Sequence, residues 1–153
     1  KKQQVQERES AGKFREIEHQ QYTINRIIVN TDYDPKVSRD HPSYDTVEIS
    51  LHHIRKDRHP TDYSIIFRKQ LLISPKIIAQ SVFINQGDLF SNLDVSKTQS
   101  RIGELGLFNL NDIRFRPATD STFANGHPGP FLDCHIDLSR RKLNSFTIET
   151  EGA

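Results

Sequence analysis

The stretch from residue 87 to residue 115 constrains the fold more than any other part of the chain. Its first half carries apolar or small side chains at helical spacing, which predicts an amphipathic helix capped by Ser91 or Asp94. The buried stripe of this helix should consist of Val95, Thr98, Ile102 and Leu105. A helix with one apolar stripe packs against other elements, so we expect the rest of the domain to assemble on it.

Gly106 directly follows this helix and is expected just beyond its last turn. There the backbone becomes left-handed, a conformation that glycine adopts without the cost of a Cβ atom. Leu107 and Phe108 are then expected to enter the core. The residues predicted to determine the fold lie in the turn before this helix, at its end and just after it: Gly87, Asp88, Leu105, Gly106 and Phe108.

A strand is expected soon after the glycine. Apolar and charged side chains alternate in Asp112, Ile113, Arg114, Phe115 and Arg116, with Ile113 and Phe115 facing inward. Asn111 falls on the inward parity, so we expect the beginning of the strand to be frayed or near solvent.

Other segments show the same alternation or a β-branched composition, which predicts strands at residues 22–30, 45–53, 63–68, 131–138 and 145–152. The second and third of these should form a hairpin inserted between the first strand and a short helix that begins at Ser74-Pro75. The strand predicted at residues 131–138 is expected to end there, because the basic run Arg140-Arg141-Lys142 follows.

Length and composition bound the possibilities. A chain of 153 residues suffices for one ordinary domain or two very small ones. Its net charge of +1 argues against a nucleic-acid binder, which usually carries a basic excess. The sequence contains no methionine, even at position 1, so we expect it to be a piece excised from a longer protein. No apolar run approaches the roughly 20 residues of a membrane helix.

No known arrangement of catalytic or metal-binding residues is evident. Cys134 alternates with apolar neighbours and should be a core residue, not a reactive thiol. Asp32 and Asp34 lack the glycine and glutamate of a calcium loop, while His52 and His53 would point to opposite faces of a strand. We therefore expect no enzyme, no metal and no cofactor.

The order of elements, together with the sequence from Leu72 to Pro117, resembles a POTRA (polypeptide-transport-associated) domain of the outer-membrane assembly family that includes BamA and TamA. The residues that carry the resemblance are Gly87-Asp88, Ser91, Leu105-Gly106-Leu107-Phe108 and Ile113-Arg114-Phe115. Gln86 and Phe90 depart from the family's usual proline and tyrosine, and the insert at about residues 31–68 is much longer than a minimal POTRA domain has.

This resemblance implies an α+β fold of order β-α-α-β-β, with two helices packed on a small mixed sheet and a hairpin insert after the first strand. It divides the chain into a polar tail or linker at 1–20, a POTRA-like domain at 21–142 and, at 143–153, the start of a strand of the membrane β-barrel. The domain would then be the barrel-proximal POTRA module of a periplasmic arm attached to the bacterial outer membrane.

Its partners would be unfolded outer-membrane proteins or accessory assembly proteins, together with the adjacent barrel of the same chain, and not nucleic acid. Clients would add a strand to the sheet edge at residues 112–116. The basic run at residues 140–142 would face lipid head groups or the barrel rim. The isolated piece is expected to be monomeric.

Two alternatives remain open at this point. The chain could be a POTRA domain of another outer-membrane export system, such as two-partner secretion or lipid or lipoprotein export. It could also be a small α+β interaction or RNA-binding domain, which predicts exposed aromatic side chains on an open sheet and a basic patch.

Overall fold

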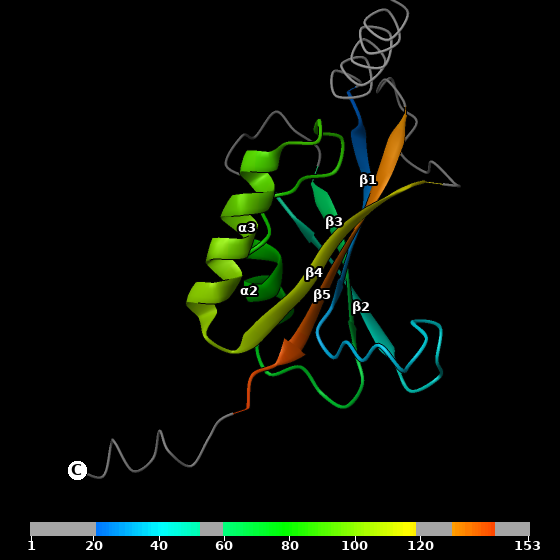
Figure 1. Cartoon of the computed structure of the whole chain (residues 1–153), viewed down its shortest axis with the longest axis vertical. Coiled ribbons are helices and arrows are strands. Elements are labelled where there is room, and N and C mark those ends of the chain that lie inside the picture. The colour runs from blue at the N-terminus through cyan, green and yellow to red at the C-terminus, as the bar shows by residue number, and fades with distance from the viewer. Residues whose placement is uncertain (1–20, 53–59, 119–129, 143–153) are drawn as a thin grey trace, which may run out of the picture.

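A computed structural model describes residues 21–52, 60–118 and 130–142 of the chain. They form one mixed sheet with helices on one of its faces (Figure 1). The strands are β1 (Thr23–Asn30), β2 (Asp45–Leu51), β3 (Thr61–Phe67), β4 (Phe108–Pro117) and β5 (Phe131–Arg140), and the helices are α2 (Pro75–Gln80) and α3 (Asn92–Leu105). The α+β class and the β-α-α-β-β order with a hairpin after the first strand are confirmed. The expected tail, the expected final strand and His53 lie outside the described residues.

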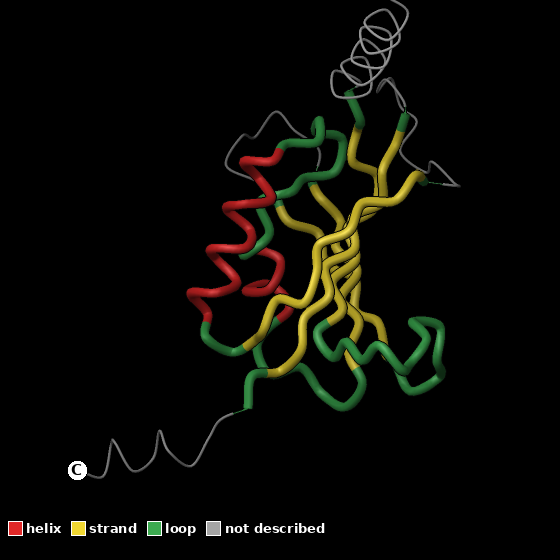
Figure 2. Tube along the Cα trace, viewed as in Figure 1, coloured by secondary structure: helices red, strands yellow, loops and turns green. Residues whose placement is uncertain are grey.

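The five strands are arranged in the order β2-β3-β1-β5-β4. Figure 2 shows the strands together as one layer beside the helices. Central β1 runs parallel to both of its neighbours, whereas β2 with β3 and β4 with β5 form antiparallel pairs. The insert therefore does form a hairpin, and β3 joins this hairpin to the main sheet. This arrangement leaves β2 and β4 as the two edges.

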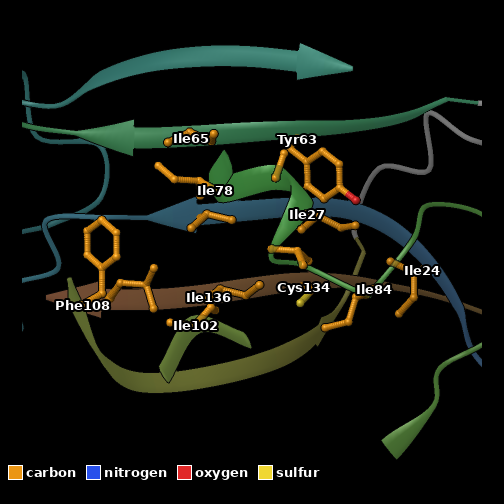
Figure 3. Packing of buried hydrophobic residues seen from close by; sticks show 14 residues of the cluster. Ile24, Ile27, Tyr63, Ile65, Ile78, Ile84, Ile102, Phe108, Cys134 and Ile136 are labelled. Carbon is orange, nitrogen blue, oxygen red and sulfur yellow. The ribbon is translucent and has the colours of Figure 1, made fainter. Parts of the chain in front are cut away.

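The core lies between the sheet and the two helices (Figure 3). It is built from alternate residues of the strands, because successive side chains of a strand point to opposite faces. Its main buried members are Ile24, Ile27, Val29, Tyr63, Ile65, Cys134, Ile136 and Leu138 from the strands, with Ile78, Ala79 and Ile102 from the helices. Cys134 is a buried free cysteine in this cluster, as expected.

The ends of both helices follow from local sequence. Ser74 caps α2, and its hydroxyl accepts a bond from the backbone N–H of Lys76 at 3.3 Å. Ser91 occupies the N-cap position of α3 without a side-chain capping bond. Gly106 ends α3 with φ of 69°, so its expected left-handed conformation is present.

The buried stripe of α3 is narrower than the sequence predicts. Thr98 and Ile102 are buried, while Leu105 is only half-buried and lies outside the core cluster. Leu105 occupies the last turn of the helix, and it is Phe108, at the start of β4, that enters the core. The expectation that Leu105 is a core residue is therefore wrong.

The loop that connects β1 to β2 is tied to the end of β5. Arg140 Nε donates to Asp32 Oδ1 at 2.8 Å, and the backbone N–H of Arg68 donates to Asp32 Oδ2 at 2.8 Å. Ser139 and Arg140 are the last residues of β5, so the expectation that this strand ends at residue 138 is wrong. The charge of Arg140 is therefore paired with Asp32 within the domain.

Candidate functional site

The predicted binding strand lies at an edge of the sheet, because β4 pairs only with β5 in the strand order. Its start differs from the prediction, since the strand begins at Phe108 and not at Asp112. The register shifts between Leu110 and Asp112, which leaves Asn111 as a β-bulge. The bulge inserts one extra residue, so the side chains before and after it do not alternate regularly between the two faces. Asn111 is therefore exposed although the strand is not frayed.

The direction of the backbone groups in β4 follows from the bonds at its end. The N–H of Ala118 donates to the carbonyl of Phe131 at 3.0 Å, which marks the preceding pair, Pro117 with Leu132, as a non-hydrogen-bonded pair. Hydrogen-bonded and non-hydrogen-bonded pairs alternate along an antiparallel ladder. The next pair inward, Arg116 with Asp133, is therefore hydrogen-bonded.

The same alternation assigns the rest of the strand up to the bulge. Asp112, Arg114 and Arg116 direct their N–H and C=O groups toward β5. Ile113 and Phe115 direct theirs away from the sheet, and no described element pairs with them. We call these outward groups of Ile113 and Phe115 the β4 edge.

The side chains of the β4 edge lie on the face of the sheet that the helices cover. Ile113 and Phe115 are partly buried against the core. The ring of Phe115 contacts that of Phe90 edge to face, with centroids 4.8 Å apart and an interplanar angle of 83°. A strand added here would place its inward side chains next to this aromatic pair.

Arg114 lies on the opposite, open face and is held there by a buried carboxylate. Its Nη2 atom is 2.6 Å from Asp137 Oδ2, and Asp137 has only 1% of its side chain exposed. Arg39, from the loop after β1, donates to both oxygens of Asp137 at 3.1 Å. Two guanidinium groups thus share one buried carboxylate, and Arg114 fastens β4 to β5.

His135 lies next to this cluster on β5 and is hydrogen-bonded to Arg39 through its Nδ1 atom. Burial and the neighbouring positive charge of Arg39 lower the pKa of His135 to about 4. The imidazole is therefore neutral at neutral pH, where it can accept the bond from Arg39.

The predicted structural turn before α3 is positioned by main-chain bonds to β1. Gly87 has φ of 81°, and its N–H donates to the carbonyl of Ile24 at 2.9 Å. The carbonyl of Asp88 accepts from the N–H of Ile24, also at 2.9 Å. Because a positive φ favours glycine, Gly87 allows the chain to turn onto β1 and lead to the aromatic contact at Phe90.

Cys134 and the possible metal ligands of the described residues were two further candidates for a chemical site. Burial raises the pKa of the Cys134 thiol to about 12, so it remains protonated. Within the described ranges, no three His, Cys, Asp or Glu side chains form a group that could hold a metal ion. None of the described helices is long and apolar enough to cross a membrane.

Sequence reasoning did not identify the second edge of the sheet, at β2. The alternation of DTVEISL predicted a strand, but pairing partners are not visible in a pattern of side chains. One sequence feature could have suggested an exposed strand here. Thr46, Glu48 and Ser50 are all polar, which is typical of a strand with one solvated face.

Comparison with known proteins finds no family model and no curated protein that matches the chain. A similar solved structure is POTRA1-3 of the periplasmic domain of Omp85 from Anabaena, with 15% sequence identity and a TM-score of 0.47. The similarity covers 80% of this chain and 35% of that chain.

Proposed function

We propose that this domain is a periplasmic POTRA module of an outer-membrane protein assembly or translocation factor. In this role it binds client or accessory polypeptides in extended form and performs no catalysis. The proposal rests on the sequence resemblance at residues 72–117 and on the β-α-α-β-β order of the elements. The further proposal that the module lies next to the barrel rests on the resemblance of residues 146–152 to a first barrel strand.

One observation carries the proposed mode of binding. Ile113 and Phe115 offer outward N–H and C=O groups on an edge strand, with the Phe90–Phe115 pair beside them. An extended client would add a strand to β4 through main-chain bonds. Such bonds require little of the client's sequence, which suits a receptor for many different barrel strands.

The side chains of a barrel strand fit this arrangement. Barrel strands alternate apolar and polar residues, so one face of a bound segment would be apolar. That face would lie against the helix-covered side of the sheet, next to Phe90 and Phe115. The polar face would lie beside Arg116, which is exposed on the open side.

The test is a titration of the 15N-labelled 153-residue chain with a synthetic peptide of a barrel strand. We expect amide shifts at Ile113 and Phe115 and slower hydrogen exchange at these two amides on binding. Phe115→Pro removes one outward N–H without removing a bond to β5, because that N–H does not face the ladder. It should weaken binding further than Phe115→Ala, which removes only the ring.

Equal binding by the Pro and Ala variants would contradict strand addition at β4. An electrophoretic shift assay with RNA provides the second control. Tight, salt-sensitive RNA binding would overturn the proposed function in favour of the nucleic-acid alternative.

A further inference from the structure

The hairpin insert replaces one edge of the sheet by another, because without it β1 would be the edge strand opposite β4. β3 covers the side of β1 that would otherwise be free, and β2 becomes the outermost strand. No described element pairs with the outer side of β2. This edge lies at the opposite end of the sheet from β4.

The outward groups of β2 can be assigned from a bond on the inner side of the hairpin. The N–H of Thr31 donates to the carbonyl of Ile66 at 2.8 Å, so the backbone groups of Ile66 face β1. Those of its neighbour Ile65 consequently face β2, where Ile65 pairs with Val47. Val47 therefore uses its N–H and C=O in the ladder.

By the same alternation, Thr46, Glu48 and Ser50 direct their N–H and C=O groups away from β3, where no described element pairs with them. We call these groups the β2 edge. The pairing of β2 with β3 continues without a register shift through all 7 residues of the strand, and β2 contains no proline. An unbroken edge of this kind is a template for strand addition.

A groove of about 740 Å³ runs beside this edge, between β2 and the α2 region. Its apolar wall includes Ile49, Leu51, Val82 and Phe83, and Phe83 is 40% exposed. Ile49 and Leu51 are only half-buried, whereas Tyr63 on the adjoining strand is fully buried. The inward side chains of an added strand would fill this groove.

The open face beside β2 has the opposite character. Glu48 is exposed there, and Asp62 of β3 lies next to Ser50, whose hydroxyl donates to the Asp62 carboxylate. Arg26 reaches the same surface from β1, two strands away from the edge. On this open face an added strand would therefore lie nearest to carboxylates, whereas Lys76 lines the groove on the helix-covered face.

We propose that the β2 edge is a second polypeptide-binding site, whose occupant is an extended segment with aliphatic side chains on one face and Lys or Arg on the other. The aliphatic face would enter the groove between β2 and α2. The basic face would lie next to Glu48 and Asp62, so charge complementarity selects the partner. This site is separate from the β4 edge and does not depend on the proposed function.

The probes are two short peptides that alternate valine with lysine or valine with glutamate, titrated into the 15N-labelled 153-residue chain. We expect the lysine peptide to shift the amides of Thr46, Glu48 and Ser50 and to slow their hydrogen exchange. Glu48→Lys should weaken binding of this peptide by about tenfold and should favour the glutamate peptide instead. Glu48→Gln, the matched neutral variant, should fall between the two.

Glu48→Pro tests the main-chain bonds, because it removes an outward N–H and leaves the ladder to β3 intact. We expect this variant to lose binding although it remains folded. The proposal is overturned if both peptides bind equally, if the shifts occur at Ile113 and Phe115, or if the chain instead self-associates through β2. Phe115→Pro should leave binding at β2 unchanged, so failure at one edge is distinguishable from failure at the other.

Discussion

The two edge strands, β4 and β2, offer the same main-chain groups to solvent but protect them differently. β4 is interrupted by a bulge at Asn111, ends at Pro117 and is fastened to β5 through Arg114 and the buried Asp137. β2 is regular, has no ion pair of this kind among the described residues, and lies beside a partly apolar groove. Bulges, prolines and charges are the usual protection of natural sheet edges.

This comparison shows that an exposed strand is not by itself a binding site. The β4 edge is short, with outward groups from Ile113 and Phe115 between the bulge and the proline. The β2 edge presents a longer uninterrupted series. The proposed strand addition at β4 would therefore depend on a short segment with an aromatic neighbour, whereas β2 would offer more main-chain bonds and an acidic surface.

The largest expected effect concerns Asp137, whose carboxylate forms an ion pair with Arg114 of β4. Asp137→Asn should lower the free energy of unfolding by about 3 kcal/mol, because Arg39 and Arg114 lose the charge that compensates them near a buried site. Urea denaturation measures this change. Hydrogen exchange should increase in β4 more than in β2, and equal increases at both edges would contradict the role of Asp137 in holding β4.

A pair of proline substitutions tests the assigned direction of the β2 backbone. Val47→Pro should lower the free energy of unfolding by roughly 3 kcal/mol, since the N–H of Val47 faces β3 and proline removes that bond. Glu48→Pro should cost less than about 1 kcal/mol, because the N–H it removes faces solvent. The reverse order in denaturant unfolding would show that the two sides of β2 are interchanged.

Two glycines at the end of α3 can be compared, Gly103 inside the helix and Gly106 just after it. A Cβ atom would meet nothing within 4 Å at either Gly103 or Gly106, but only Gly106 has a positive φ, of 69°. Gly106→Val should therefore cost about 1–3 kcal/mol through backbone strain. Gly103→Ala should instead stabilise the helix by about 0.5–1 kcal/mol, and thermal unfolding of both variants checks the contrast.

The last prediction concerns a pH dependence that arises at His135, on the strand paired with β4. Burial lowers the pKa of His135 from 6.5 to about 4, so between these values the unfolded chain binds a proton that the folded domain does not. The free energy of unfolding should fall as pH decreases through this window. His135→Asn should show a shallower fall over the same range in urea titrations, and an unchanged slope would exclude His135 as the cause.

Much of the fold could be predicted because the sequence patterns are local. The alternation in residues 131–138, the Ser74-Pro75 helix start and the glycine after α3 each identify an element or its end. Leu105 shows the limit of such patterns, since helical spacing placed it in the stripe but only Thr98 and Ile102 of α3 are fully buried. The spacing of apolar residues identifies the apolar face of a helix, but it does not show how much of that face other elements bury.

The candidate sites could be predicted only in part. Residues 112–116 do lie on an edge strand, but the role of Asn111 as a bulge depends on its register with β5. The β2 edge depends on the pairing of β3 with β1, and the partners of Arg39 and Arg140 lie about 100 positions away, such as Asp137 for Arg39. Side-chain periodicity contains no information about such distant partners.

The sequence by itself determined which segments of this protein are helices and strands, which side of each is apolar, and where Gly106 turns the chain. Only the tertiary structure decided that β3 pairs with β1, that β2 and β4 become the two edges, and which backbone groups remain outside the ladders. The physical reason is that local propensity acts between neighbours in sequence. Strand order and register are instead fixed by the joint burial of many distant side chains between one sheet and two helices.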